Sequence, residues 1–396
     1  MSGAGAIGTN VIGTDVIRAG SMPVLALNAG SSSLKFGLYA VDARGVRMLV
    51  SGSAETSGGQ HGTLRASDAD GNALAGDASA IGTPRDAFDR IIALLAAQGL
   101  PMPAAVGHRI VHGGVGCRQH TLIDAAVMQQ LEAAKAFAPL HVPPAMALVH
   151  CAQERFPGVP QSACLDTAFH ADMPVVARTL PIPRELRMHG IERYGFHGLS
   201  CESIVRQLGN DLPARLVVAH LGHGASVTAI AKSRSIDTSM GLTPSGGVIM
   251  STRCGDIDPG VVGYLVRALH YDAAQLESLI DQQSGMLGIS GLSGDMRDLH
   301  AAAASNADAR LAIAMFGYSV RKQVAAMGAA LGGIDMLVFT GGIGENDPLV
   351  RADICEGLRG LCIRTDAPDV RVIASQENEQ IALHAWRLAV AVGTDP

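Results

Sequence analysis

The chain has 396 residues, 48% of them hydrophobic and 17% charged, and carries a formal net charge of −6. This length corresponds to about two or three domains, and the composition is ordinary for a soluble globular protein. The acidic balance and the lack of a basic cluster argue against a nucleic-acid-binding or membrane-surface protein, and no apolar run in the sequence is long enough to cross a bilayer.

Residues 1–21 are interpreted as a flexible N-terminal extension, because they lack the basic start and continuous apolar core of a secretory signal. The segment GAGAIG at 3–8 spells a dinucleotide-binding fingerprint, but no strand precedes it, which argues against that function. Seven cysteines are dispersed without a C-x-x-C pair. This usage favours a reducing, cytoplasmic location over a disulfide framework.

The first third of the chain predicts a hairpin followed by alternating strands and helices. Apolar runs at 24–29 and 34–41 predict two strands joined by the small-residue segment NAGSSSLK, and the Gly- and Ser-rich residues 43–83 predict short strands and turns. Thr83-Pro84 predicts a helix start and Gly99-Leu100-Pro101 its end. We then expect a buried strand in AVGHRI, helices at 124–136 and 144–155, a strand ending in ACLDTAFH, and an irregular stretch at 174–200.

The second half repeats the layout of the opening hairpin. RLVVAHLG at 215–222 and SVTAIA predict two strands around a small-residue loop. A long Ala-rich helix near 308–331 precedes IDMLVFTGGIGEN, which predicts another strand ending in a glycine-rich loop. Alternating strands and helices indicate an α/β fold, and the repeated hairpin suggests two related lobes with a cleft between them.

The three strand-to-loop junctions, near residues 28, 222 and 341, raise the question of phosphate binding. Small residues at a strand end let backbone N–H groups approach a phosphate closely. Serine-rich tracts are more often linkers, and only the repetition makes the phosphate interpretation equally well supported. None of the three loops is a Walker A motif, and the chain has neither the G-x-S-x-G nor the H-R-D signature.

Several charged residues lie in unusual surroundings. Arg109 in VGHRIVHGG and Arg253 in STRCGDIDPG lie near apolar runs, where an arginine usually faces a cleft or an anion; a structural salt bridge is the alternative. Asp166 follows an apolar run, so its carboxylate is expected at a strand end, as a metal ligand, a catalytic group or a helix cap.

The histidines are less informative than the arginines. His108 and His112 are four residues apart, as helical zinc ligands are, but their segment is predicted to be a strand. His141 and His197 lie beside prolines, glycines or an aromatic residue, where a histidine is more often packed than catalytic.

Taken together, nine segments in order closely resemble the acetate kinase (acetokinase) family: LNAGSSSLKF, VGHRIVHGG, APLHVPP, LDTAFH, RYGFHGLS, HLGHGAS, TRCGDIDPG, SGDMRD and FTGGIGEN. The resemblance implies the fold of sugar kinases, actin and heat-shock chaperones, with two ribonuclease-H-like lobes of duplicated βββαβαβα core around a nucleotide cleft. The N-terminal lobe would take residues 22–168 and 378–396, and the nucleotide-binding lobe residues 169–377.

The resemblance also implies an activity. A Mg²⁺-dependent homodimer, with Mn²⁺ as an alternative metal, would reversibly transfer the γ-phosphoryl group of ATP to acetate by direct in-line displacement, giving acetyl phosphate and ADP. It would bind neither nucleic acid nor membrane. A propionate or butyrate kinase of the same family is the nearest alternative, since one methylene shifts preference by only about 1–3 kcal/mol. An ATP-switched binding protein on the same fold is the alternative from another class.

Residue by residue, the resemblance implies the following groups. The metal would be held by Asn28 and Glu377. The catalytic residues would be Asp166, Arg109, His197, Arg253 and His141. The transferred phosphoryl group would face Lys35, Ser31 and Ser33. The ATP phosphates would be cradled by His220, Leu221, Gly222, His223 and Gly224. The adenosine would be surrounded by Asp295, Met296, Arg297, Gly341, Gly342, Ile343, Gly344 and Glu345. The acyl pocket would be lined by Arg109, Val111, Leu140, Phe196 and Pro244.

These roles agree with the chemistry of phosphoryl transfer, which needs positioning and charge neutralisation more than covalent help. The two arginines would flank the phosphoryl group and His197 would stabilise its transition state. Because the acyl carboxylate is itself the nucleophile, Asp166 is better interpreted as an organiser of metal or water than as a base.

The sequence departs from the family pattern at three places. His223 replaces the asparagine of HLGNGAS, Met296 replaces a common phenylalanine, and residues 245–251 differ from the usual segment after Pro244. These departures leave acyl-chain and nucleotide preference open.

Overall fold

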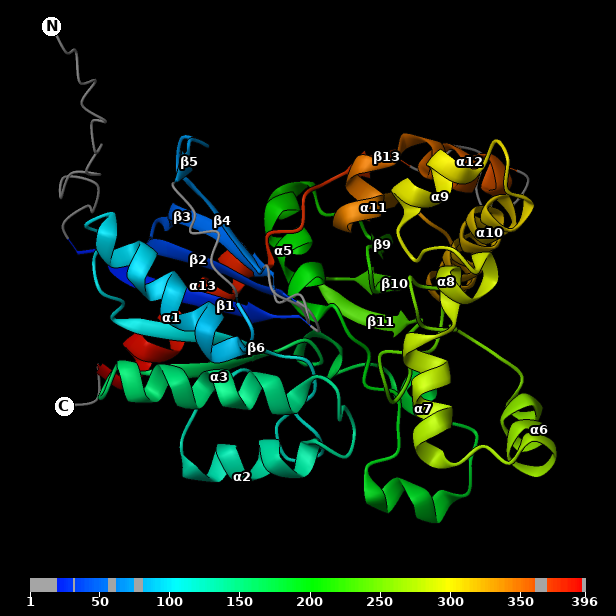
Figure 1. The fold of residues 1–396 in the computed structure, drawn as a ribbon, viewed down its shortest axis with the longest axis horizontal. Coiled ribbons are helices and arrows are strands. Elements are labelled where there is room, and N and C mark those ends of the chain that lie inside the picture. Colours follow the sequence, from blue (N-terminus) through cyan, green and yellow to red (C-terminus); the bar gives the residue numbers. More distant parts are fainter. Residues whose placement is uncertain (1–19, 31–32, 56–61, 75–80, 360–368, 394–396) are drawn as a thin grey trace, which may run out of the picture. The chain divides into compact units, whose positions relative to one another are not determined.

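The computed structural model describes residues 20–30, 33–55, 62–74, 81–359 and 369–393. The chain divides into two compact units: unit 1 is Met1–Leu165 with Glu377–Pro396, and unit 2 is Asp166–Gln376. Each unit has its own β-sheet (Figure 1), so the predicted α/β class is confirmed. The sequence predicted lobes at 22–168 with 378–396 and at 169–377, and these limits remain a prediction. Residues 1–19 of the predicted extension lie outside the described residues.

The sheet of unit 1 has eight strands in the order β5-β4-β3-β2-β1-β6-β8-β7. The strands are β1 Met22–Ala29, β2 Ser33–Asp42, β3 Gly45–Glu55, β4 Thr63–Asp68, β5 Ala73–Leu74, β6 Ala105–Ile110, β7 Thr121–Leu122 and β8 Gln161–Leu165. Strands β1 to β5 pair antiparallel in succession, whereas β1, β6 and β8 run parallel. The opening hairpin is therefore confirmed.

Strand β3 corrects the prediction of short strands and turns, because it has 11 residues. Its small residues are needed for packing and do not break the strand. A Cβ on Gly52 would lie 2.2 Å from the carbonyl oxygen of Arg65 and 2.7 Å from the ring of Phe36. Glycine in a strand often marks such a close approach, and composition alone cannot distinguish it from a turn.

Helices cover both faces of this sheet. They are α1 Pro84–Ala97, α3 Val142–Arg155 and α13 Glu377–Gly393, and α2 Ala125–Ala134 packs on α3. On one face, Phe88 of α1 and Leu148 of α3 share a buried core with Phe36 and Val106. On the other face α13 lies so close that a Cβ on Gly107 would be 2.6 Å from Ile381 Cγ2. The last helix of the chain thus completes the unit that the first strand begins.

Unit 2 repeats the same sheet in shorter form. Its strands are β9 Leu216–Leu221, β10 Ala225–Ala231, β11 Arg234–Thr238, β12 Met336–Thr340 and β13 Asp369–Val372, in the order β11-β10-β9-β12-β13. Strands β9, β10 and β11 are antiparallel, and β9, β12 and β13 are parallel. The order matches β3-β2-β1-β6-β8 of unit 1. The predicted duplicated core is therefore confirmed.

Some helices of unit 2 pack on this sheet, and others extend beyond it (Figure 1). They are α4 Val175–Arg178, α5 Gly198–Leu208, α6 Pro259–Leu269, α7 Ala273–Gln282, α8 Gly285–Ser290, α9 Met296–Ala302, α10 Ala307–Leu331, α11 Gly341–Asn346 and α12 Pro348–Leu358. Short 3₁₀ turns lie at Ala168–His170, Arg184–His189 and Gly209–Asp211. Helix α5 buries Cys201 and Ile204 against Leu216 and Val218. No helix in the described residues is long and apolar enough to cross a membrane.

The predicted third glycine-rich loop is wrong, because GGIGEN forms the short helix α11 directly after β12. Gly341 begins it with a φ of +80°, a backbone conformation that favours glycine. The Glu345 carboxylate then accepts a hydrogen bond from the Gly341 N–H at 2.9 Å. A carboxylate partner at this position stabilises the first turn of a helix.

Helix α1 offers a test of the local signals in unit 1. Thr83 Oγ1 accepts from the Asp86 N–H at 3.1 Å, and the Asp86 carboxylate accepts from the Thr83 N–H at 2.9 Å. We expect Thr83→Ala to lower the free energy of unfolding by about 1 kcal/mol, because it removes one half of this capping box. The only tryptophan, Trp386, lies in α13, so urea unfolding followed by its fluorescence reports on unit 1.

Thr83→Ser is the matched control, since it keeps the hydroxyl, and it should stay within a few tenths of a kcal/mol of the unmodified protein. Equal losses in both variants would show that the methyl group, and not the cap, carries the effect.

Candidate functional site

In unit 1, a partly buried polar group gathers around the buried Asn28 at the end of β1. The side chain of Asn28 accepts a hydrogen bond from Arg109 Nη1 at 3.0 Å and donates to Glu377 Oε2 at 3.1 Å and Asn378 Oδ1 at 3.2 Å. Strand β6 supplies Arg109 beside β1, and the first residues of α13 supply the other two. The fold thereby joins residues 349 positions apart in the chain.

This arrangement brings together the two predicted metal residues and a predicted catalytic arginine. Glu377 and Asn378 present a carboxylate and an amide oxygen, which are ligand types for hard cations. Asn378 was missed by sequence reasoning; its signal is its place beside Glu377 in the polar start of the last helix. Arg109 donates to a neutral amide here, an arrangement that leaves its positive charge uncancelled by this contact.

The opening hairpin adds Lys35 to the same face. Asn28 and Lys35 are directly opposite in the antiparallel register of β1 and β2, and opposite residues of such a pair share one face of the sheet. The turn is closed by the Gly30 N–H, which donates to the Ser33 carbonyl at 2.7 Å. Ser31 lies outside the described residues.

The remaining predicted residues of unit 1 are dispersed around this group. Val111 is buried just after β6, whereas Leu140 is 41% exposed. His141 is the N-cap residue of α3.

The zinc alternative for His108 and His112 gains no support, because His108 is a strand residue and not a helical one. The Nε2 atom of His108 lies 2.8 Å from Gln161 Oε1, and burial lowers the pKa of the imidazole to about 4. The ring is therefore neutral at physiological pH.

In unit 2, His197 and Arg253 approach the same point of the backbone. A Cβ on Gly224 would lie 3.2 Å from His197 Nε2 and 3.3 Å from Arg253 Nη1. The absence of a Cβ on Gly224 therefore lets both side chains lie against the loop between β9 and β10. Two such donors close together suit an anion with several oxygens.

The His197 side chain is held in place by a serine and by a second histidine. His197 Nδ1 is 2.9 Å from Ser226 Oγ, and the ring stacks on His220 with centroids 4.2 Å apart. The Nδ1 atom of His220 is 2.8 Å from Ser200 Oγ. The two serines were missed by sequence reasoning, because an isolated serine carries no pattern.

The backbone around His197 is unusual. His197 has a φ of +58°, in the left-handed region that non-glycine residues rarely adopt and that often marks functional positions. The following Gly198 N–H donates to the Asp166 carbonyl at 2.8 Å, and a Cβ there would lie 2.3 Å from that oxygen. The buried Asp166, directly after β8, is therefore fixed against the start of α5.

Arg253 lies on the segment that follows Pro244. Its Nη1 atom donates to the Pro244 carbonyl at 3.1 Å and lies 3.9 Å from Met250 Sδ. Pro244 and Phe196, the two predicted acyl-pocket residues of this unit, are both buried.

The predicted phosphate loop adjoins the start of α11. The Gly222 N–H donates to the Gly224 carbonyl at 3.0 Å, and a Cβ on Gly222 would lie 3.6 Å from the Gly342 nitrogen. Leu221 is buried, and a Cβ on Gly341 would lie 2.7 Å from its carbonyl oxygen. The two glycine-rich segments are thus brought together.

The predicted adenosine residues divide between backbone and surface roles. Glu345 Oε1 accepts from the N–H groups of Gly341 and Ser375, both at 2.9 Å, so it positions the backbone. Met296 is 4% exposed, whereas Arg297 lies at the surface, paired with Asp295 at 2.6 Å. An adenosine contact from Met296 would need its backbone. The predicted site draws on both units, and the joining of the two groups stays a prediction.

Comparisons with known proteins cover most of the chain. The profile of the Acetokinase family matches residues 23–393. An acetate kinase of Rhodopseudomonas palustris is 39% identical over 394 residues, covering 92% of this chain and 98% of that protein. An acetate kinase of Deinococcus deserti is 45% identical over 356 residues, covering 87% and 88%.

Solved structures agree with the sequence matches. A propionate kinase from Francisella tularensis has a TM-score of 0.85 and 35% identity, covering 93% of this chain and all of that one. An acetate kinase from Porphyromonas gingivalis has a TM-score of 0.80 and 32% identity, covering 93% and 99%.

His223 provides a pH-dependent test of the loop. Burial and the nearby Arg253 lower the pKa of its imidazole below the ordinary value of a histidine, while Asp295 acts in the opposite direction. The ring is therefore neutral at pH 7 and gains a positive charge on acidification. If it contacts a nucleotide phosphate, the KM for nucleotide should fall as pH drops through this pKa.

The measurement compares His223→Asn with the unmodified chain across the acidic range. The KM ratio of variant to unmodified protein should rise as the pH is lowered, and this ratio cancels the titration of the nucleotide itself. A ratio independent of pH would rule out a phosphate contact by the charged ring.

Proposed function

Because the chain belongs to the acetokinase family and is a phosphotransferase of the kinase type, we propose that it transfers the γ-phosphoryl group of ATP reversibly to acetate, giving acetyl phosphate and ADP. The observation that carries this proposal is the convergence of His197 Nε2 and Arg253 Nη1 at Gly224. A phosphoryl group in transfer spreads negative charge over three equatorial oxygens, and two converging donors suit that charge.

The hydrogen bonds support distinct roles for the two donors. When Ser226 donates to Nδ1 of His197, the Nε2 atom carries the proton and can donate to a phosphoryl oxygen. Arg253 supplies a fixed positive charge, which its backbone contact to Pro244 orients. The acetate carboxylate is the nucleophile: its oxygen forms the new P–O bond while the bond to the ADP oxygen breaks, so no general base is required. We assign Arg109 to the opposite side of the phosphoryl group and Asp166 to organising water or metal.

The residues of unit 1 fit a divalent metal. Glu377 offers one carboxylate and Asn378 one amide oxygen. The amide oxygen of Asn28 lies at the same place and also accepts from Arg109 Nη1. Mg²⁺ commonly takes one or two carboxylates and completes its coordination with water and substrate phosphates. We propose that Asn28 and Glu377 hold Mg²⁺, or Mn²⁺ in its place, and that Lys35 lies beside the phosphates. When bound, the ion would neutralise phosphate charge.

Propionate is a second candidate acceptor, because a propionate kinase is among the similar solved structures. The proposed acyl pocket combines the buried Val111, Phe196 and Pro244 with the partly exposed Leu140. A pocket of this apolar kind discriminates one methylene by only about 1–3 kcal/mol. The choice between acids therefore needs kinetics.

The deciding experiment is hydroxamate formation from ATP, Mg²⁺ and each of acetate, propionate and butyrate. We expect the highest kcat/KM with acetate. A clear preference for propionate would move the substrate assignment to the second candidate. Tight ATP binding with no acyl phosphate from any acid would favour an ATP-switched binding protein.

Arg253→Gln tests the proposed transfer role in the same assay. We expect kcat to fall on the order of 10³-fold or more, because the variant loses charge at the transferring group. Arg234→Gln is the matched control, since Arg234 is an exposed arginine of β11 in the same unit, and it should keep full activity. Equal activity of both variants would remove Arg253 from the reaction.

We also propose that the protein is a homodimer. Helix α6 is rich in apolar residues, yet none of its residues is buried, and Tyr264 is 59% exposed. Val261 lies one turn away from Tyr264 and is also exposed, so the two form an apolar stripe. A second copy of the chain would cover it.

The dimer proposal predicts that Tyr264→Glu yields a monomer by light scattering while the unmodified chain has twice the monomer mass. Met102→Glu, which adds the same charge to an exposed apolar site of unit 1, should remain dimeric. A dimer that persists in Tyr264→Glu would place the interface elsewhere.

A further inference from the structure

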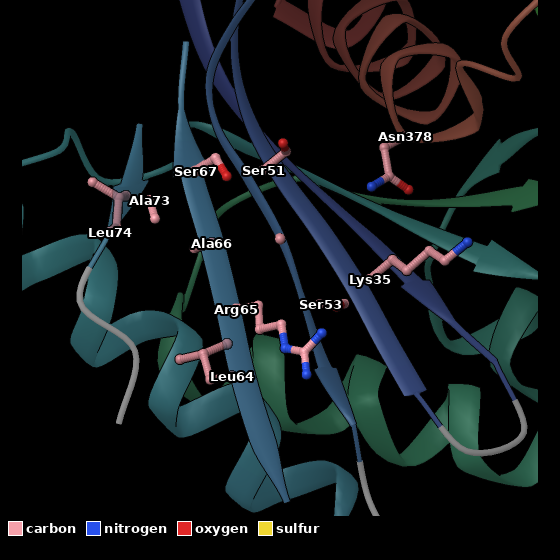
Figure 2. A pocket seen from close by; sticks show the side chains of 11 residues that line it. Lys35, Ser51, Ser53, Leu64, Arg65, Ala66, Ser67, Ala73, Leu74 and Asn378 are labelled. Atoms are coloured by element: carbon pink, nitrogen blue, oxygen red, sulfur yellow. The ribbon is translucent and has the colours of Figure 1, made fainter. Parts of the chain in front are cut away.

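Unit 1 contains a cavity of about 620 Å³. Of its lining, only Lys35 and Asn378 belong to the site of the proposed reaction. It lies over β2, β3, β4 and β5, beside the start of α13 (Figure 2). Its polar lining consists of Lys35, Ser51, Ser53, Arg65, Ser67 and Asn378.

Strand register explains why these side chains share one face. Lys35 is opposite Ser53 in the β2–β3 pairing, and Ser53 is opposite Arg65 in the β3–β4 pairing. Opposite residues of antiparallel strands lie on the same face, so the three form a row across the sheet. Ser51 and Ser67 form a second row beside the first.

The row continues from the proposed metal residues outward. Asn28 is opposite Lys35, so Arg65 lies three strands away from Asn28. Adjacent strands are about 4.8 Å apart, so the backbones of Lys35 and Arg65 are separated by about 10 Å. Figure 2 shows the Arg65 guanidinium extending toward the strand of Ser53, with Lys35 and Asn378 on the other side of the cavity.

The described lining of the cavity carries two cations, Lys35 and Arg65. Among the described residues, no side chain forms an ion pair with Lys35 or Arg65, and no acidic residue lines the cavity. Two cations with three hydroxyls and an amide are the complement of a phosphate-bearing anion, because arginine binds phosphate oxygens in a fork and hydroxyls donate to the rest.

Protection of the sheet edge against pairing with other chains explains less of this arrangement. Charged side chains near a sheet edge discourage pairing with other chains, which would account for Arg65 on β4. Lys35, however, lies on β2 in the interior of the sheet. The three serines between and beside the cations add hydrogen-bond donors that edge protection does not require.

We propose that this cavity binds a small diphosphate-bearing anion, held by Lys35 at one end and Arg65 at the other, with the Ser53 hydroxyl between them and those of Ser51 and Ser67 beside them. The strands that carry the two cations are two strand spacings apart, which suits a group with charge at both ends. Because the proposed function also assigns Lys35 to the reacting phosphates, an anion here would withdraw its ammonium group and inhibit turnover. This last consequence alone depends on the proposed function.

The test is calorimetric titration of the full chain with inorganic pyrophosphate in the absence of metal. We expect Arg65→Gln to weaken pyrophosphate binding about 10-fold or more, because a charge-assisted contact is lost. Arg47→Gln is the matched control: Arg47 is an exposed arginine of β3 outside the cavity, and its variant should bind as the unmodified chain does. Equal binding by all three proteins would overturn the site.

Two further measurements separate the possible outcomes. Titration with ADP distinguishes the source of the diphosphate: a weak second ADP site that Arg65→Gln removes indicates a nucleotide, and ADP binding unchanged by the variant indicates free diphosphate. Inhibition of hydroxamate formation by pyrophosphate should weaken in Arg65→Gln while kcat and KM without inhibitor stay unchanged. Because calorimetry needs no turnover, a chain that forms no acyl phosphate would still reveal this site.

Discussion

The amide of Asn28 is the contact around which the described part of unit 1 is arranged. It joins the first strand, the parallel neighbour that carries Arg109, and the start of the last helix through three hydrogen bonds. A buried amide requires such partners, because leaving its donors or acceptors unsatisfied costs about 1–3 kcal/mol. The same requirement places a carboxylate and an arginine at one point of the sheet, so the packing of α13 and the chemistry of this group are inseparable.

The two units use one sheet design with different chemistry at the first hairpin. In unit 1 the strand after the turn begins with Ser33 and Lys35, which present a hydroxyl and a positive charge. In unit 2 the corresponding turn contains Gly222, His223 and Gly224, and the absence of a Cβ on Gly224 lets His197 and Arg253 lie against it. Duplication thus supplied two scaffolds, and the side chains at equivalent turns distinguish them.

Local signals in the sequence predicted much of the fold, and distant partners explain what they missed. The strands of the opening hairpin and the cap at Thr83 depend on residues close in sequence, and they are confirmed. The helix at GGIGEN was mistaken for a loop because its Glu345 also binds the N–H of Ser375, 30 residues later. Family resemblance identified the family and the fold, which the comparisons confirm.

The candidate site shows the same division between local and distant information. Arg109 and Arg253 could be selected because a charge among apolar residues is conspicuous in any sequence. Ser226 and Ser200 could not, since they matter only through the histidine rings they contact. The left-handed backbone of His197 was equally invisible, because it accompanies the close packing of Gly198 against Asp166, 32 positions earlier in the chain.

Because α13 belongs to unit 1, the two units become complete in a fixed order during synthesis. A ribosome synthesises the chain from its N-terminus, so every residue of unit 2 is made before Glu377–Pro396 of unit 1 emerges. Until then the surface around Gly107, which Ile381 and Ala385 cover in the finished protein, has no helix against it. Unit 2 can therefore fold first, and the half of the protein that begins the chain is the last to be completed.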